Sequence, residues 1–140
     1  MANDAQTPGR VFISYRRTDT AAYAGRLYDH LVDSFGEQHV LMDVDSIEPG
    51  TEFRLVIEQA VASCEILLVL IGRQFLDATE AEGRRRIDDP DDYVRLEIEA
   101  ALRNKVFVTP VLTEGSLMPR AQDLPVEIQA PGATSGNGIE

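Results

Sequence analysis

Glu97 is the residue whose type and position most favour chemistry in this sequence. The segment from Asp91 to Leu102 predicts a helix, and at about 100° per residue its apolar positions fall within one narrow arc, made by Val94, Ile98, Ala101 and Leu102. Glu97 lies beside that arc, with Tyr93 one turn earlier on the same side, whereas Arg95 and Glu99 are expected to point toward water. A carboxylate and an aromatic ring at the boundary between core and solvent suit the wall of a binding pocket. The alternative is that Glu97 is an ordinary charge flanking an amphipathic helix.

Candidate binding residues leave the ends of two predicted strands. The run 11–15 ends in two arginines, and the run 40–42 is followed directly by two aspartates. In a mainly parallel sheet the ligand crevice lies outside the carboxyl ends of the strands. Cations, acids and aromatic rings that converge there could hold a phosphate-bearing ligand and place one carboxylate at its reactive carbon. The candidates for this crevice are Tyr15, Arg16, Arg17, Asp43, Tyr93 and Glu97.

Four strands and three helices are predicted to position these residues. The strands are expected at 11–15, 40–42, 66–71 and 106–112, and the helices at 20–35, from Thr51 to about residue 64, and at 91–104. The unbroken apolar run 66–71 is typical of a central strand covered on both faces. Pro110 indicates that the last strand lies near a sheet edge or contains a bulge. Strands that alternate with crossover helices predict an α/β domain with a mainly parallel sheet.

The length suits a single domain, since 140 residues can bury a sizeable core. We expect a disordered leader at 1–9, the folded domain at 10–125 and a flexible tail at 126–140, where proline, glycine and serine replace any helical pattern. The charged connection 73–90 is long for a compact domain, and such loops are often functional or mobile.

The composition excludes several classes of function. A formal charge of −11 disfavours unspecific nucleic-acid binding, although a local basic cluster could still bind a small anion. The single cysteine, Cys64, allows no internal disulfide and favours a reducing compartment. No apolar run is long enough to span a bilayer, and no signal segment opens the chain, so a cytoplasmic location without membrane contact is expected.

Familiar catalytic motifs are missing from the sequence. It has no glycine-rich phosphate loop, its two histidines and one cysteine are too widely spaced for a zinc site, and no Ser-His-Asp set is indicated, so we expect no metal. Asp43 and Asp45 resemble the acidic cluster of a response regulator. The phosphorylatable aspartate of such a protein would end the third strand, however, where Ile71 and Gly72 stand.

Three segments together resemble a known family. Residues 11–17 (VFISYRR) look like the first box of Toll/interleukin receptor (TIR) domains, and 42–50 (MDVDSIEPG) resembles the second box and the loop after it. Residues 92–98 (DYVRLEI) resemble the helical segment that carries the catalytic glutamate in the NAD-cleaving members. The three occur in the order of the family, cover roughly residues 10 to 125, and are closest in style to its bacterial members.

The resemblance implies a flavodoxin-like, three-layer α/β fold whose last strand and helix are missing or degenerate here. It also implies an NAD+ nucleosidase or cyclase that releases nicotinamide and ADP-ribose or a cyclic variant, with NAD+ as substrate and no cofactor. Glu97 matches the catalytic position, and Tyr93 stands where the family usually has tryptophan or another aromatic residue. Less close matches to pocket positions, expected to bind the substrate, are Tyr15, Arg16, Arg17 and Asp43.

The family also implies assembly with other TIR domains. The second-box loop often packs against a neighbouring protomer, and here it comprises Asp45, Ser46, Ile47, Glu48, Pro49 and Gly50. The role expected from the resemblance is in bacterial defence or virulence signalling. The alternative is a non-catalytic TIR module that acts only through homotypic association.

Overall fold

The computed structural model describes residues 9–42, 52–113 and 115–129. Its four strands are β1 (Val11–Ser14), β2 (Val40–Leu41), β3 (Ile66–Ile71) and β4 (Phe107–Leu112), and all neighbouring pairs are parallel in the order β2-β1-β3-β4. Three helices connect them, namely α1 (Arg17–Phe35), α2 (Phe53–Ala62) and α3 (Tyr93–Arg103). The prediction of an α/β domain with a parallel sheet is therefore confirmed.

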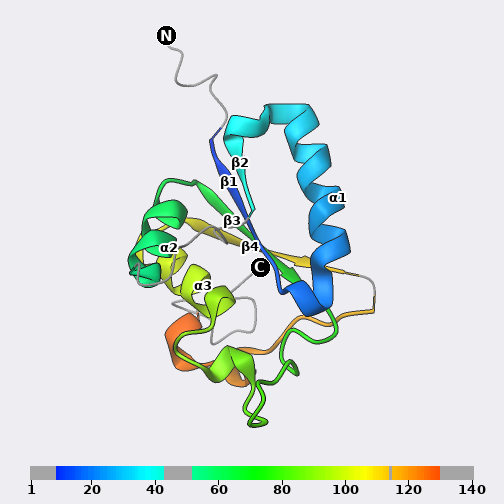
Figure 1. Ribbon diagram of the computed structural model, residues 1–140, viewed down its shortest axis with the longest axis vertical. Helices are drawn as coiled ribbons and strands as arrows, with labels where there is room; N and C mark the ends of the chain where they lie inside the picture. Colours follow the sequence, from blue (N-terminus) through cyan, green and yellow to red (C-terminus); the bar gives the residue numbers. More distant parts are fainter. Residues whose placement is uncertain (1–8, 43–51, 114, 130–140) are drawn as a thin grey trace.

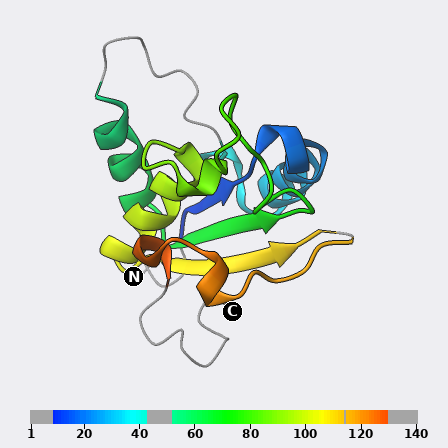
Figure 2. The same cartoon turned by 90° about the horizontal axis from the view of Figure 1, so that it is seen from below.

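Three layers result, because α1 covers one face of the sheet and α2 and α3 cover the other (Figures 1 and 2). The alternation of side chains along each strand shows this division directly. Phe12 and Leu67 pack in the core beneath α2 and α3, whereas Ile13 and Leu70, the opposite-parity neighbours on the same two strands, pack beneath α1. β3 contributes to both cores, as the unbroken apolar run predicted.

β4 is an edge strand among the described residues, as Pro110 indicated. The N–H of Phe107 donates to the carbonyl of Glu65 and the N–H of Thr113 to that of Ile71, so the odd-numbered residues of β4 face β3. Pro110 has the opposite parity, and its missing N–H falls on the open side of the strand. A proline here removes no hydrogen bond from the sheet and interrupts an edge to which another chain could pair.

The turns after the first and third strands meet closely. Gly72 follows β3, and a Cβ atom there would lie 2.4 Å from a carboxylate oxygen of Asp19, in the first turn of α1. The same carboxylate accepts a hydrogen bond of 3.2 Å from the N–H of Gln74. Only a residue without a side chain permits this approach, which ties the start of α1 to the loop after β3.

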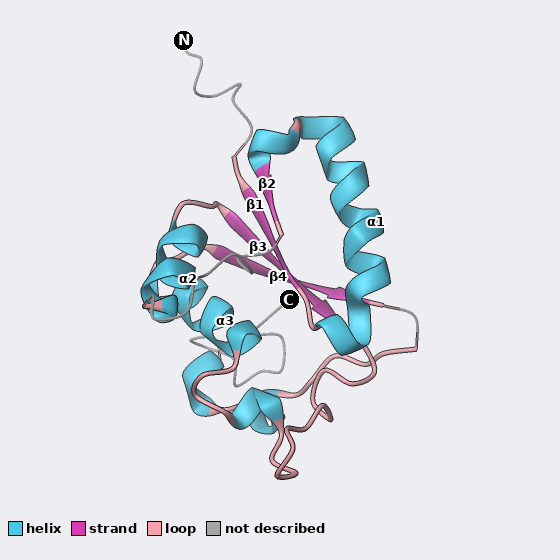
Figure 3. Ribbon diagram, viewed as in Figure 1, coloured by secondary structure: helices cyan, strands magenta, loops and turns pink. Residues whose placement is uncertain are grey.

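The chain stays packed beyond residue 125. Single-turn 3-10 helices are the regular elements between 115 and 129: η4 (Ala121–Asp123) and η5 (Val126–Ile128), shown as short helical turns in Figure 3. Ile128 is buried in the core beneath α2 and α3. The expected tail from residue 126 therefore begins with a packed turn. No helix of the described residues is long and apolar enough to cross a membrane.

α3 differs from its prediction on the side that faces away from the cleft. It begins at Tyr93, after the N-cap Asp92, and buries the expected apolar positions Val94, Ile98 and Ala101. Arg95 and Glu99 were expected to point toward water, and this was wrong, because their side chains are only 8% and 15% exposed. The loop before α3, which includes η3 (Arg86–Asp88), and η5 both lie over this side of the helix and cover Arg95.

Candidate functional site

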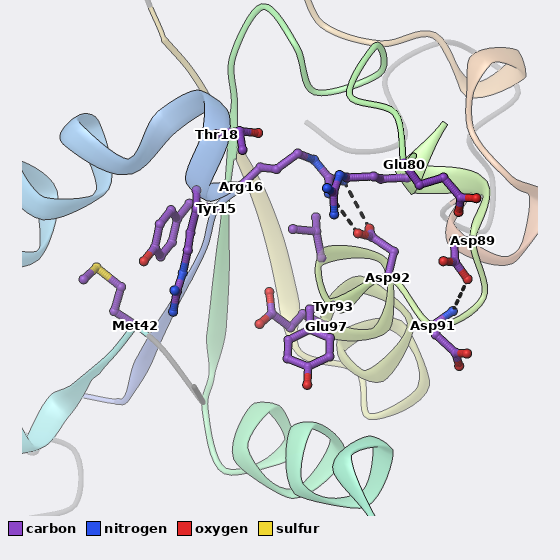
Figure 4. A pocket seen from close by; sticks show the side chains of 13 residues that line it. Tyr15, Arg16, Thr18, Met42, Glu80, Asp89, Asp91, Asp92, Tyr93 and Glu97 are labelled. Carbon is purple, nitrogen blue, oxygen red and sulfur yellow. Dashed lines mark hydrogen bonds and ion pairs between the residues drawn. The ribbon is translucent and has the colours of Figure 1, made fainter. Parts of the chain in front are cut away.

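A cleft of about 640 Å³ opens at the carboxyl ends of the strands. It lies between the end of β1, the start of α1, the loop before α3 and the first turns of α3 (Figure 4). This is where a parallel sheet of this kind binds its ligands. The described residues that line it are Tyr15, Arg16, Arg17, Thr18, Met42, Glu80, Arg86, Asp89, Asp91, Asp92, Tyr93, Val94 and Glu97.

Every candidate residue that the structure describes lines this cleft. These residues are Tyr15, Arg16, Arg17, Tyr93 and Glu97. Asp43 and the loop from Asp45 to Gly50 lie outside the described residues, so their roles remain predictions.

Glu97 occupies the second turn of α3, and its side chain is drawn toward the open space between that helix and Tyr15 (Figure 4). The residue is only 7% exposed although it lines the cleft. It is more enclosed than an ordinary charge on the outer surface of an amphipathic helix. Charges interact strongly in such a partly dry environment, so this carboxylate is well placed to act on a positive charge that develops in the cleft.

Tyr93 forms a wall of the cleft beside Glu97 and is held from behind by an aromatic contact. Its ring stacks on that of Phe53, with 5.5 Å between the ring centroids and an angle of 23° between the planes. Phe53 is the first residue of α2, and it was not among the residues that the sequence indicated for the cleft. The contact restricts Tyr93 while leaving part of its ring open to the cleft, since the residue is 44% exposed.

Arg16 is already paired within the protein. Its Nη1 donates to Oδ1 of Asp92 at 2.8 Å and its Nη2 to Oδ2 of the same carboxylate at 3.1 Å. The guanidinium also lies 6.0 Å from the ring centre of Phe75. Sequence reasoning missed Asp92, although an aspartate directly before a helical apolar pattern is a preferred N-cap residue.

The remaining charges of the cleft are mostly held in ion pairs at its outer rim. Arg84 Nη2 lies 2.9 Å from Glu80 and 3.7 Å from Asp89, and Arg54 of α2 pairs with Asp91. Hydrogen bonding to Glu80 raises the pKa of the Arg84 guanidinium. These pairs neutralise several of the acids that line the cleft.

Arg86 is the exception among the arginines of the loop. It lines the cleft, is exposed, and makes no side-chain hydrogen bond or ion pair with the residues that the structure describes. Arg86 ends a run of three arginines, 84–86, within the charged connection 73–90, and such a run is the kind of local basic cluster that could bind a small anion. Its guanidinium is available to an anionic ligand.

Comparison with known proteins identifies one matching family model, described as TIR domain, which covers residues 11–133. No curated protein matches the chain. A similar solved structure is "Structure of the activated Roq1 resistosome directly recognizing the pathogen effector XopQ (TIR domains)", with 17% sequence identity and a TM-score of 0.57. The match covers 86% of this chain and 66% of that chain, which is slightly less than two thirds. At this identity the likeness concerns the fold alone.

Proposed function

This chain belongs to the TIR domain family, and from that premise we propose that it is an NAD+ nucleosidase of the bacterial type. The reaction breaks the N-glycosidic bond of NAD+ and releases nicotinamide together with ADP-ribose or a cyclic variant. The observation that carries the proposal is the position of Glu97, an enclosed carboxylate facing a cleft of about 640 Å³ beside a stacked tyrosine. This volume falls within the range of pockets that hold small organic ligands.

The chemistry requires little more than one well-placed carboxylate. The bond from the anomeric carbon to the nicotinamide nitrogen breaks, and its electron pair neutralises the cationic ring, so the leaving group needs no general acid. The ribose passes through an oxocarbenium-like state, as in glycoside cleavage. Glu97 would orient the ribose hydroxyls and stabilise the developing positive charge. Water then forms the new bond to the anomeric carbon and loses a proton to solvent, or a nucleophile of the same molecule closes a cyclic product.

The other groups of the cleft suit the rest of the substrate. Tyr93 and Tyr15 offer aromatic surfaces to a planar ring. Arg17 lies on the exposed first turn of α1, and Arg86 lies on the opposite loop, so both can contact a pyrophosphate from the solvent side. Asp43 is proposed as a further substrate contact from the end of β2. NAD+ enters as a substrate, and the scheme uses no cofactor.

Association with other TIR domains is the second part of the proposal. The assembly loop would comprise Asp45–Gly50, and α2, which follows it, carries Phe53 against Tyr93 of the cleft. The Roq1 structure is described as an activated resistosome, which supports a link between assembly and activity in this fold. We therefore expect turnover to rise with protein concentration, and a role in cytoplasmic defence or virulence signalling.

Chromatography of the products of NAD+ turnover tests the proposal. Protein at high concentration or with a crowding agent should release nicotinamide, and Glu97→Gln should lower the rate by roughly 100- to 1000-fold, the usual loss when one group that stabilises the transition state is removed. Glu82→Gln is the control, because it makes the same substitution at an exposed glutamate outside the cleft. Equal rates in the two variants would refute the assignment of Glu97. If no assembled form of the protein cleaved NAD+, the result would reject the proposed activity and support the alternative, a non-catalytic module that acts by TIR–TIR association.

A further inference from the structure

The ion pair between Arg16 and Asp92 joins two distant parts of the chain inside the cleft. The two residues are separated by 76 positions, and two hydrogen bonds of 2.8 and 3.1 Å connect the guanidinium to both carboxylate oxygens. The side chains are 6% and 7% exposed. A bidentate ion pair of this kind fixes the relative orientation of the two groups as well as their distance.

Both partners are N-cap residues of helices. Arg16 caps α1, where its carbonyl accepts the N–H groups of Asp19 and Thr20. Asp92 caps α3, where its Oδ2 accepts the N–H of Arg95 at 3.1 Å. The pair therefore ties the end of β1 and the start of α1 to the first turn of α3, and Figure 4 shows its two bonds crossing between them.

Glu97 lies on the helix that this pair holds. It follows Asp92 by five residues, which is about 7.5 Å along the axis at roughly 1.5 Å per residue. A shift or fraying of the first turn of α3 would displace the Glu97 carboxylate relative to Tyr15 and Arg17 across the cleft. Displacements of this size are costly in catalysis, where an error of about 1 Å can lower a rate 100-fold.

The same contacts leave Arg16 poorly suited to bind the substrate directly. Asp92 neutralises its charge and takes one hydrogen bond from each terminal nitrogen. A phosphate would have to compete with a buried carboxylate, whose loss of its partner carries a large desolvation cost. Arg17, the next residue, is exposed and reaches the same cleft.

We infer that Arg16 is a positioning residue, which acts through Asp92 to hold α3 and hence Glu97, and is not the substrate contact that its place in the sequence suggested. The kinetic part of this inference rests on the proposed NAD+ cleavage. The structural part, that the pair holds the first turn of α3, does not.

Steady-state kinetics of Arg16→Gln, Asp92→Asn and the double variant test the kinetic part. Asparagine is also a good N-cap, so Asp92→Asn removes the charge and keeps the cap. We expect each single variant to lower kcat by roughly 10- to 100-fold with KM changed less than about threefold, and the double variant to lose no more than the worse single one. A rise in KM for Arg16→Gln alone, with losses that multiply in the double variant, would overturn the inference. Arg16→Lys keeps the positive charge but cannot form the bidentate pair, so its kcat should lie between those of Arg16→Gln and the wild type.

Amide hydrogen exchange tests the structural part without any substrate. In Arg16→Gln the amides of the first turn of α3 should exchange about tenfold faster or more, while those of α2 remain as in the wild type. Unchanged exchange at α3 would overturn the inference even if activity fell. Faster exchange at α3 in a protein whose wild type cleaves no NAD+ would uphold the positioning role and reject the proposed reaction. If Arg16→Gln fails to fold by circular dichroism, Arg16→Lys and Asp92→Asn provide the same comparison.

Discussion

One buried arginine, Arg95, lies on the back of α3, and another, Arg16 at the start of α1, contacts the cleft side of α3 through Asp92; their polar groups are satisfied to different degrees. Behind the helix, Arg95 bonds to Glu99, Glu127 and the carbonyls of Ile87 and Asp88, so that all three of its nitrogens have partners. On the cleft side, Arg16 bonds only to Asp92, and its buried Nε has no hydrogen-bond partner among the described residues.

This difference in hydrogen bonding distinguishes the Arg95 cluster, which is structural, from the cleft, which is the candidate site. A fully satisfied polar network fixes one arrangement of the chain. Arg95 in this way joins α3 to the loop before it and to η5, in a region where the chain forms no further strand among the described residues. The cleft side keeps enclosed charges and open volume together, which is costly for stability and useful for binding. Changes behind α3 should therefore affect mainly the global stability, and changes in the cleft should affect mainly turnover and the local opening of α3.

Arg95→Met should produce the largest loss of stability. Methionine fills similar space but leaves two carbonyls and the partly buried Glu99 without their donor, and breaking a buried ion pair on one side costs about 3–5 kcal/mol. Urea unfolding followed by circular dichroism measures the change. Arg103→Met is the matched control on the same helix, because its ion pair with Glu58 is exposed and should contribute less than about 1 kcal/mol. Equal losses in the two variants would contradict a structural role for the Arg95 cluster.

Ile128→Ala tests whether η5 is an integral part of the domain. Ile128 is 1% exposed, and it borders a small apolar void shared with Leu124 and Ile98, so truncation would enlarge an existing cavity. We expect a loss of about 2–4 kcal/mol in the free energy of unfolding. Val126→Ala, an exposed position of the same turn, should change it by less than about 0.5 kcal/mol. A small loss at Ile128 would instead favour a loosely attached end.

Arg95 and Ile128 also show why sequence patterns predicted the cleft side of α3 better than the opposite side. Helical periodicity depends only on neighbours within a few turns, and it placed Glu97 and Tyr93 together beside the apolar arc. It could not show that residues 86–89 and 126–128 fold over Arg95, because that covering comes from parts of the chain with no period of their own. The strands could be predicted from the sequence as well, because an apolar run is also a pattern between neighbouring residues.

The pairing of Arg16 with Asp92 illustrates the second limit. Nothing local in the sequence links two residues that are 76 positions apart, so Arg16 was interpreted from its type and its place at a strand end. The N-cap preference could have indicated a role for Asp92 at the start of α3, but it would have named no partner. Only the topology of the sheet brings the two helix starts to one cleft.

Phe53→Leu should have a smaller effect, confined to the cleft. The substitution removes the ring that stacks on Tyr93 and keeps most of the apolar volume, and aromatic pairs contribute about 0.5–1.5 kcal/mol beyond burial. With NAD+ turnover established, we expect KM to rise roughly two- to tenfold. Leu55→Ala, an exposed position on α2, is the control and should leave KM unchanged. A loss of stability in Phe53→Leu without a change in KM would place Tyr93 in the packing and not in substrate binding.

Asp88→Asn should have the smallest effect, and one that depends on pH. Hydrogen bonds from Arg85 hold the pKa of the Asp88 carboxyl below its usual value of 3.8. Because the folded state has the lower pKa, this stabilisation is present above about pH 4 and is lost as pH falls through the pKa of the folded state. The pair is more than one third exposed, so solvent screening limits its contribution to less than about 1 kcal/mol. Urea unfolding at a series of pH values should show the wild type and Asp88→Asn differing at pH 7 and converging in acid, with a smaller difference at high salt. A difference that persists in acid would mean that the Asp88 side chain contributes through its shape and hydrogen bonding and not through its charge.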